Sequence, residues 1–252
     1  MKQIPNLITS LNLAAGFAAI ILTTNANLLA ASWLIVAAMI FDFLDGFSAR
    51  LLKAYSETGK ELDSLADVVS FGVAPALIVY KLLVPAISNI ALPDSLLYIL
   101  VLMPVCAALR LAKFNIDTTQ TTSFKGLPTP ANAIAVISVV MAANYSSMPL
   151  LKSFTESPAA LLIYTVILSL LMVTRLPLLS LKFKNLKFKG NEGRFIIIGL
   201  VLISFIIFGL AAAPLIIPIY LIVSLITPPI PHTGALSIKD QPPNPQMGGF
   251  NS

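Results

Sequence analysis

Four aspartates stand close together in the first third of the chain, at spacings that suit a helical metal site. Asp42 and Asp45 are three residues apart, and Asp63 and Asp67 are four apart. On an α-helix such residues share one face, so each pair presents two carboxylates in one direction. These groups repel one another and are unfavourable in a membrane helix unless something neutralises them. Hard divalent cations, which carboxylate oxygens bind and which also bind substrate phosphates, fit this requirement.

The segment between the two pairs adds groups that suit a phosphorylated substrate. We expect a short loop from Arg50 to Glu61 to join two antiparallel helices, so that all four carboxylates face one site. Gly46, Ala49 and Gly59 are small, as is needed where a bulky substrate approaches the backbone. Arg50 offers a fixed cationic fork for phosphate. Two cations close together would clamp a diphosphate and stabilise charge on the entering and leaving oxygens.

The scarcity of cysteine and histidine narrows the possible chemistry. Cys106 is the only cysteine and His232 the only histidine. A single cysteine forms no intrachain disulfide and no cysteine metal cluster. A Ser-His-Asp triad or a His-ligated metal in the membrane is equally disfavoured. Cys106 lies in an apolar run and is expected only to pack, so acid–base chemistry would depend on a carboxylate.

The composition is that of an integral membrane protein. Of 252 residues, 57% are hydrophobic and 11% charged, with a mean hydropathy of +0.90, whereas soluble domains carry about a quarter charged residues. The runs without Asp, Glu, Lys or Arg are 3–41, 95–109, 126–151, 157–174 and 195–238. A bilayer-spanning helix needs roughly 20 apolar residues. Little length therefore remains for a large soluble catalytic domain, a zinc module or a nucleic-acid reader, and we expect no nucleic-acid partner.

The apolar runs predict an all-α bundle of about eight transmembrane helices, with seven as the alternative that would place the carboxyl-terminal tail on the other side of the membrane. The expected spans are 11–24, 28–44, 62–83, 95–113, 130–148, 158–175, 195–211 and 213–227. The last two divide one stretch that is too long for a straight span, and Pro214 and Pro218 are expected to break it. Residues 1–10 are expected at the membrane interface, and residues 1–227 to form one membrane domain. The Pro-rich segment 228–252 cannot bury a core and is expected to be a disordered tail.

The basic residues favour one side of this topology. With eight spans and both termini on one side, fourteen of the sixteen Lys and Arg residues lie on that side, leaving only Lys81 and Lys152 on the other. Under the positive-inside rule this side is the cytoplasm. The run 182–189 can also contact anionic headgroups of membrane lipids. We therefore expect an enzyme of the cell membrane whose aspartates face the cytoplasm.

The aspartates and the small residues between them form an ordered pattern, Asp42-x2-Asp45-Gly46-x2-Ala49-Arg50-x8-Gly59-x3-Asp63-x3-Asp67. It resembles the signature of the CDP-alcohol phosphotransferases at every defined position. The resemblance implies transfer of a phosphatidyl group from a CDP-linked lipid, or of a phosphoalcohol from a CDP-alcohol, with release of CMP. It also implies two bound divalent cations, Mg²⁺ or Mn²⁺, and a homodimer.

Carried over by position, the resemblance implies a role for each residue of the pattern. Asp42 and Asp63 would each bridge both metals. Asp45 would complete one metal site and Asp67 the other, and Asp67 would also act as general base. The residues that match positions in contact with the CDP group are Gly46, Arg50 and Ser56. For Ser56 a solvated loop serine is the alternative.

Further segments resemble the phosphatidylserine synthases within this superfamily. They are 4–12, 61–75, 108–115 and 124–133. In the first, Asn6, Thr9 and Asn12 are candidates for contact with the cytidine diphosphate, and capping at the interface is the alternative. From about residue 150 onward only a hydrophobic pattern is recognisable.

Serine as the acceptor also follows from charge matching. Serine brings a carboxylate and an ammonium, so its pocket needs one or two cations. Arg110, Lys113 and Lys125 lie on the same predicted membrane side as the aspartates. Placement by the positive-inside rule is the alternative, and we favour it for Lys113. Arg110 and Lys125 lie in the family-like segments, and we predict that they bind serine.

The expected reaction transfers the phosphatidyl group of CDP-diacylglycerol to the hydroxyl of L-serine. Asp67 would take the hydroxyl proton, and the oxygen would attack the phosphorus attached to diacylglycerol, giving phosphatidylserine and CMP. The alternatives within the family are another acceptor or an ether-lipid donor, as in an archaetidylserine synthase. A polyprenyl transferase would show Asp-Asp-x-x-Asp-like clusters. A transporter, the non-enzyme alternative, more often has inverted repeats or helices broken at mid-membrane.

Overall fold

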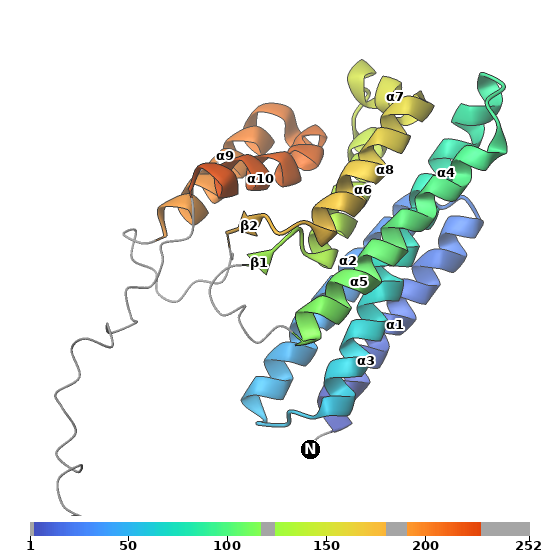
Figure 1. Cartoon of the computed structure of the whole chain (residues 1–252). Helices are drawn as coiled ribbons and strands as arrows, with labels where there is room; N and C mark the ends of the chain where they lie inside the picture. Colours follow the sequence, from blue (N-terminus) through green and yellow to red (C-terminus); the bar gives the residue numbers. More distant parts are fainter. Residues whose placement is uncertain (1–2, 117–123, 180–190, 228–252) are drawn as a thin grey trace, which may run out of the picture.

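A computed structural model describes residues 3–116, 124–179 and 191–227, which form a helical bundle (Figure 1). The α-helices are α1 (Gln3–Thr24), α2 (Leu28–Leu51), α3 (Glu57–Asp67), α4 (Ala74–Asn89), α5 (Leu102–Ile116), α6 (Thr129–Tyr145), α7 (Pro149–Glu156), α8 (Pro158–Val173), α9 (Glu192–Phe208) and α10 (Ile216–Ile226). The other elements are the π-helix η1 (Val68–Val73), the 3₁₀-helices η2 (Asp94–Val101) and η3 (Gly209–Leu215), and the strands β1 (Phe124–Lys125) and β2 (Pro177–Leu178). The predicted all-α class is confirmed.

Helices α1 and α2 form a long hairpin that carries one side of the aspartate site. Asn27 begins α2, and its side chain accepts a hydrogen bond from the backbone nitrogen of Ala30 at 3.2 Å, which satisfies one free donor of the first turn. The two helices pack along their length, and each carries a fully buried small residue, Ala19 on α1 and Ala31 on α2. Small side chains let helix backbones approach closely in a membrane, and this holds the two long helices together.

The run from Glu57 to Asn89 passes the site as α3, η1 and α4 without a break. The backbone widens into the π-helix η1 directly after Asp67, and such turns are frequent at functional sites. Two glycines let other helices pack closely on η1. A Cβ at Gly16 of α1 would lie 2.8 Å from Ser70 Cα, and a Cβ at Gly72 would lie 3.0 Å from Ala107 Cβ of α5.

The start of α6 is fixed by a short connection to the end of α8. Strands β1 and β2 pair antiparallel, with Phe124 opposite Leu178. The backbone nitrogen of Gly126 donates to Leu176 O at 2.9 Å, and that of Leu127 donates to Leu171 O at 2.9 Å. These bonds hold the residues that lead into α6 against the segment that follows α8.

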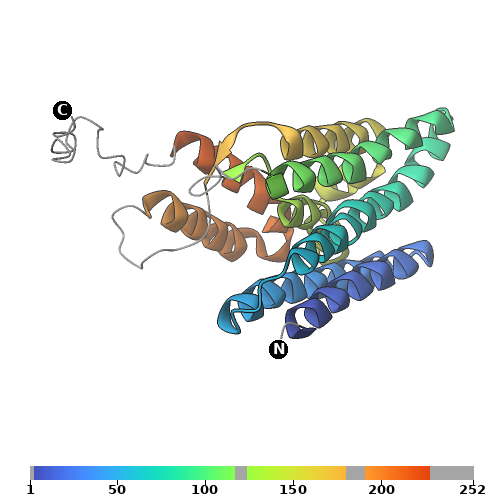
Figure 2. The same ribbon diagram turned by 60° about the horizontal axis from the view of Figure 1, so that its bottom comes forward.

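The centre of the bundle lies between η1, α4, α5, α6 and α8. Its fully buried side chains include Phe71, Ile78, Leu83, Met103 and Leu161. Helices α9 and α10 lie on the side of the bundle away from α1, as both ribbon views show (Figures 1 and 2).

The predicted count of eight spans is not confirmed. Within the described residues, the helical runs long and apolar enough to cross a bilayer are Gln3–Thr24, Leu28–Leu51, Glu57–Asn89, Asp94–Ile116 and Glu192–Ile226. A bent pair, α7 with α8 at 82°, makes a sixth if it is one span, and α6 is apolar but shorter. In the stretch predicted to form two spans, α9 ends before Gly209, where φ is +57°, and η3, which contains the predicted breaker Pro214, separates it from α10. Glycine tolerates this left-handed backbone, which other residues avoid.

The helix ends near the site also differ from the prediction. Helix α1 already begins at Gln3, so the residues expected at the interface belong to the first long helix. The connection predicted from Arg50 to Glu61 is shorter, because α2 continues to Leu51 and Ser56 caps α3 directly afterwards. The predicted tail, 228–252, and the basic run 182–189 lie outside the described residues.

Candidate active site

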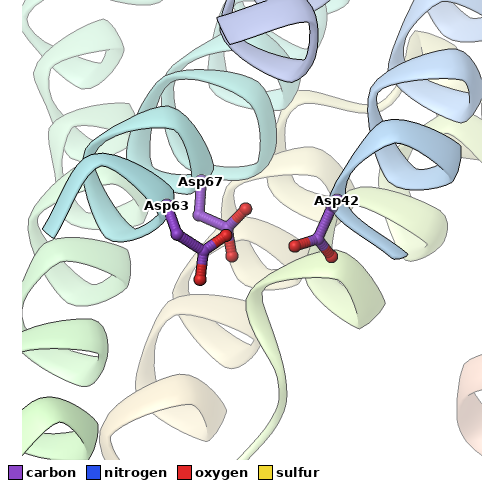
Figure 3. A group of neighbouring side chains, drawn as sticks. All are labelled: Asp42, Asp63 and Asp67. Atoms are coloured by element: carbon purple, nitrogen blue, oxygen red, sulfur yellow. The ribbon is translucent and has the colours of Figure 1, made fainter. Parts of the chain in front are cut away.

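Three of the four predicted aspartates converge in one cluster. One carboxylate oxygen from each of Asp42, Asp63 and Asp67 lies within 4.8 Å of the other two. Figure 3 shows the three side chains facing a common space from α2 and α3. Asp63 Oδ1 is buried and, among the described residues, has no hydrogen-bond partner. An all-oxygen donor set with one buried, unsatisfied oxygen fits a hard divalent cation.

The fourth aspartate, Asp45, lies one turn along α2 and outside this cluster. It is 5% exposed, and its Oδ2 lies 2.6 Å from the hydroxyl of Thr9 on α1, which donates a hydrogen bond to it. The same hydroxyl lies 3.0 Å from Pro5 O, so its single proton serves the shorter contact to the carboxylate. The structure thus places Asp45 beside the cluster and in contact with α1. Its role as a metal ligand stays a prediction.

Asp67 is held from α1 by an amide. Asn12 is fully buried, and its Nδ2 donates to Asp67 Oδ1 at 3.3 Å. The Ser70 hydroxyl in η1 donates to the backbone oxygen of Asn12 at 3.1 Å. Asn12 therefore contacts the carboxylate that is the predicted base. The sequence suggested a contact with the nucleotide instead, and that contact stays a prediction.

A cavity of about 200 Å³ opens next to Asp63 and Asp45. Its lining residues are Pro5, Asn6, Thr9, Asp45, Gly46, Ala49, Ala54, Tyr55, Ser56, Gly59, Lys60 and Asp63. Six of the residues predicted to bind the CDP-lipid are in this set: Asn6, Thr9, Gly46, Ala49, Ser56 and Gly59. Of the other two predicted CDP-lipid residues, Asn12 contacts Asp67 and Arg50 lies outside this lining.

The two motif glycines differ in what surrounds them. A Cβ at Gly59 would lie 2.8 Å from Asn6 Oδ1 and 2.9 Å from Ser56 Oγ, so any larger residue there would displace one of these two side chains. Near a Cβ at Gly46 the closest atom would be a guanidinium nitrogen of Arg50 at 3.8 Å. Gly46 therefore leaves space that the fold itself does not use, on the wall of the cavity.

Ser56 and Arg50 both make local contacts near the mouth of the cavity. The hydroxyl of Ser56 accepts a hydrogen bond from the backbone nitrogen of Gly59 at 3.0 Å and caps α3. It is therefore a helix cap rather than a free loop serine. Arg50 is exposed, and its Nε donates to Gly46 O at 2.9 Å. Its predicted contact with phosphate stays a prediction.

The residues considered for binding the substrate serine differ in how much the structure says about them. Arg110 on α5 is 9% exposed, its charge is attracted by that of Asp67, and its guanidinium carbon lies 5.9 Å from the centre of the Phe114 ring. Among the described residues its Nε has no hydrogen-bond partner. The backbone of Lys125 lies in β1, but its side chain lies outside what the structure describes. Lys113 is exposed, as expected for a residue placed by the positive-inside rule.

The sequence analysis missed a polar link between α3 and the end of α5. Lys60 lines the cavity, and its Nζ donates to Asn115 O at 2.7 Å. The Asn115 amide in turn donates from Nδ2 to Ser64 Oγ at 2.9 Å. These partners are far apart in sequence, so no helical spacing could have paired them. The link fixes the helix of Asp63 against the helix that carries Arg110.

Comparison with known proteins agrees with this site. The sequence model of the CDP-alcohol phosphatidyltransferases matches residues 2–227. The chain is 35% identical to the CDP-diacylglycerol–serine O-phosphatidyltransferase of Helicobacter pylori over 225 residues, which cover 88% of this chain and 89% of the relative. It is 36% identical to the enzyme of the same name from Bacillus subtilis over 192 residues, which cover 76% of this chain and 96% of the relative.

An archaeal relative widens the comparison. The archaetidylserine synthase of Methanothermobacter thermautotrophicus is 37% identical over 149 residues, which cover 58% of this chain and 60% of the relative. Together with the aspartate cluster, these matches show that the chain belongs to the CDP-alcohol phosphatidyltransferase family. The family resemblance that the pattern from Asp42 to Asp67 predicted is confirmed.

Proposed function

We propose that this chain transfers the phosphatidyl group of CDP-diacylglycerol to the hydroxyl of L-serine, releasing CMP and forming phosphatidylserine. The observation that carries the proposal is the position of the Asp42, Asp63 and Asp67 cluster beside a cavity lined by the predicted nucleotide-binding residues. The printed names of the bacterial relatives, which match this chain over most of its length, support serine as the acceptor. Family membership also argues against a transporter.

Divalent cations, Mg²⁺ or Mn²⁺, fit the donor set of the site. Asp42, Asp63 and Asp67 would hold one cation, and Asp45 would complete a second site with them. When bound, the two cations neutralise a diphosphate and stabilise charge on the entering and leaving oxygens. Carboxylate oxygens suit these hard ions better than softer metals, which favour sulfur or imidazole ligands.

The residues of the chain position both substrates. The CDP group would occupy the cavity between α1, α2 and α3, where Gly46 leaves room for it and Asn6 supplies an amide. Asp67 would accept the proton of the serine hydroxyl. Asn12 donates to Oδ1 of Asp67 and thereby orients this carboxylate. The serine oxygen then bonds to the phosphorus that carries diacylglycerol, and the bond from that phosphorus to CMP breaks.

The same proposal includes a membrane orientation and an oligomer. The exposed basic residues Arg50, Lys53 and Lys60 lie at the end of the α2–α3 hairpin near the cavity. By the positive-inside rule this end faces the cytoplasm, where serine is available. Labelling of Lys53→Cys in a chain with Cys106 replaced should occur from the cytoplasmic side. We also propose a homodimer, as the family resemblance implies.

The reaction is tested with the purified full chain in detergent or vesicles containing CDP-diacylglycerol. We expect CMP release that depends on L-serine and on Mg²⁺ or Mn²⁺, with phosphatidylserine identified by mass spectrometry. CMP release with glycerol 3-phosphate or inositol phosphate but not with serine would assign another acceptor. Absence of CMP with every alcohol would contradict the proposed chemistry.

A second experiment identifies which CDP-lipid is the donor. The archaetidylserine synthase relative favours an ether-linked CDP-lipid as the alternative donor. The pattern from Asp42 to Asp67 contacts the CDP part and is the same for both donors. Competition between CDP-diacylglycerol and its ether-linked counterpart, read from the masses of the products, distinguishes the two.

A further inference from the structure

The first turn of α6 lies beside the aspartate cluster. Asn132, in this turn, donates from Nδ2 to the backbone oxygen of Phe71 at 2.9 Å. Phe71 lies in η1, one turn after Asp67, and α6 packs against both η1 and α2. In Figure 3 the ribbon of α6 begins next to Asp42 and Asp67. The first residue of α6, Thr129, is one turn before Asn132 and is thus brought to the level of Asp67.

This turn carries hydrogen-bond donors for which the described part of the chain provides no acceptor. Thr129 is 1% exposed, and its hydroxyl has no hydrogen-bond partner among the described residues. The first backbone N–H groups of a helix have no acceptor within the helix. The residue before α6 is Pro128, and no side chain caps the turn. Thr129 and Ala131 supply backbone N–H groups there, while Pro130 has none.

The donors are held in place before any ligand arrives. The backbone bonds of Gly126 and Leu127 to Leu176 and Leu171 fix the residues that lead into the turn. The bond from Asn132 to Phe71 fixes the turn against the helical run of Asp67. A helix amino terminus is partly positive and favours an anion. A fixed, unsatisfied set of donors at such a terminus suits a small anionic group.

We propose that the first turn of α6 binds the carboxylate of the acceptor, with the hydroxyl of Thr129 and the backbone N–H groups of Thr129 and Ala131 as donors. This inference rests on the proposed function, in which the acceptor is serine. The carboxyl carbon of serine is two bonds from the carbon that bears the hydroxyl. The binding site for the carboxylate must therefore lie next to the base, and this turn lies beside Asp67.

With the acceptor carboxylate bound at the first turn of α6, the positive groups of the site form two sets, one for each substrate. The cations held by Asp42, Asp63 and Asp67 would neutralise the diphosphate of the donor, which lies over the cavity on the α1–α3 side. The first turn of α6 packs on the helical run of Asp67 through the bond from Asn132 to Phe71, and Arg110 on α5 adds a positive charge near Asp67. A phosphate of the donor has the same hydrogen-bonding chemistry as a carboxylate. The experiment below separates these two sources.

The test is the substitution Thr129→Val, which removes the hydroxyl and keeps the shape of the side chain. Steady-state kinetics of the full chain are measured with each substrate varied separately. We expect the KM for L-serine to rise about tenfold or more and the KM for CDP-diacylglycerol to stay unchanged, because a hydrogen bond to a charged group is lost. Thr129→Ser, which keeps the hydroxyl, should recover most of the serine affinity.

A buried threonine elsewhere provides the matched control. Thr165 on α8 is fully buried and donates to Leu161 O at 2.8 Å. Thr165→Val makes the same chemical change away from the site and should leave both KM values unchanged. If Thr129→Val does not fold, as judged by size-exclusion chromatography and thermal unfolding, Thr129→Cys replaces it, since a thiol is only a weak donor.

Acceptor choice gives a second measurement. In a mixture of L-serine and ethanolamine, Thr129→Val should shift the lipid product toward phosphatidylethanolamine, because ethanolamine has no carboxylate to lose. An unchanged serine KM and product ratio overturn the inference while leaving the proposed function intact. A rise in the KM for CDP-diacylglycerol alone assigns the turn to the donor phosphate and also overturns it. If the unaltered chain makes no product from serine, both proposals fail together.

Discussion

Asn12 on α1 donates a hydrogen bond to Asp67 on α3 at 3.3 Å, and its own backbone oxygen accepts one from Ser70 in η1 at 3.1 Å. The first helix is therefore bonded to the helical run of the proposed base at two points, once at Asp67 itself and once at Ser70. The π-helix η1 begins directly after Asp67, so this is where the backbone departs from regular α-helix. The geometry of the base depends on a contact between residues 55 positions apart in sequence.

The first prediction concerns this contact. Asn12→Ala should lower kcat about tenfold or more with a smaller change in the KM for either substrate, because Asp67 loses a donor that orients it. Steady-state kinetics check this. Ser10→Ala on the same helix is the control, since Ser10 is exposed and donates only to Asn6 O. An unchanged kcat in Asn12→Ala would contradict the positioning role.

The second prediction concerns the metal site. Asp42→Asn and Asp63→Asn should each abolish CMP release and weaken Mn²⁺ binding, which electron paramagnetic resonance of the purified protein measures independently of activity. Each substitution removes a charge from the cluster of three carboxylates. Glu61→Gln is the matched control, because Glu61 is an exposed acid on the same helix as Asp63. Full turnover in excess EDTA would rule out the metal-dependent mechanism.

The third prediction separates the two motif glycines. Gly46→Ala should leave thermal stability nearly unchanged and raise the KM for CDP-diacylglycerol, because the new methyl group meets only the end of Arg50 at 3.8 Å and enters the cavity. Gly59→Ala should lower both stability and donor affinity, because its methyl group would approach Asn6 and Ser56 at 2.8 and 2.9 Å. Thermal unfolding and kinetics are measured on both. Equal loss of stability in the two variants would contradict this distinction.

Much of the site was predictable because its residues lie on one helical face or in one short loop. The spacing of Asp42, Asp63 and Asp67 is local within each helix, and the loop between the helices leaves few ways to arrange them. The same holds for Gly46 and Gly59 on the wall of the cavity. The pattern was therefore sufficient to predict that Asp42, Asp63 and Asp67 lie together, whereas Asp45 lies beside this cluster and the roles of all four stay predictions.

Contacts between distant segments could not be predicted in the same way. The hydrogen bond from Asn132 to Phe71 and the link from Lys60 to Asn115 join helices whose packing no local spacing determines. The number of candidate membrane spans differed from the predicted eight for a related reason. Hydropathy marks apolar stretches, but the number of spans also depends on bends such as the 82° between α7 and α8, which no local pattern indicates.

The fourth prediction concerns the loop that fixes α6. Gly126 has φ +78°, and a Cβ there would lie 2.7 Å from Thr174 O. Gly126→Ala should lower the unfolding temperature, since both the left-handed backbone and the contact with a carbonyl are unfavourable for alanine. Gly199→Ala is the control, because a Cβ at Gly199 in α9 meets nothing within 4 Å. Thermal unfolding of the two variants in one detergent checks the difference, and an equal effect would contradict it.

The last prediction concerns Arg110. Arg110 is buried on α5, its Nε has no hydrogen-bond partner among the described residues, and its charge is attracted by Asp67. A buried guanidinium near the proposed base suits the carboxylate of serine, and we expect Arg110 to bind it. Arg110→Ala should therefore raise the KM for serine about tenfold to a hundredfold and the KM for CDP-diacylglycerol much less, because a charge-assisted hydrogen bond is lost.

The control for Arg110 is Lys113→Ala on the same helix, since Lys113 is exposed and is expected to change neither KM. A double substitution then asks whether Arg110 and Thr129 contact the same group. If both bind one carboxylate, the combined effect of Arg110→Ala and Thr129→Val on serine KM should be smaller than the product of the single effects. If Arg110→Ala instead raised only the KM for CDP-diacylglycerol, Arg110 would belong to the donor site, and the charge division between the substrates would be wrong.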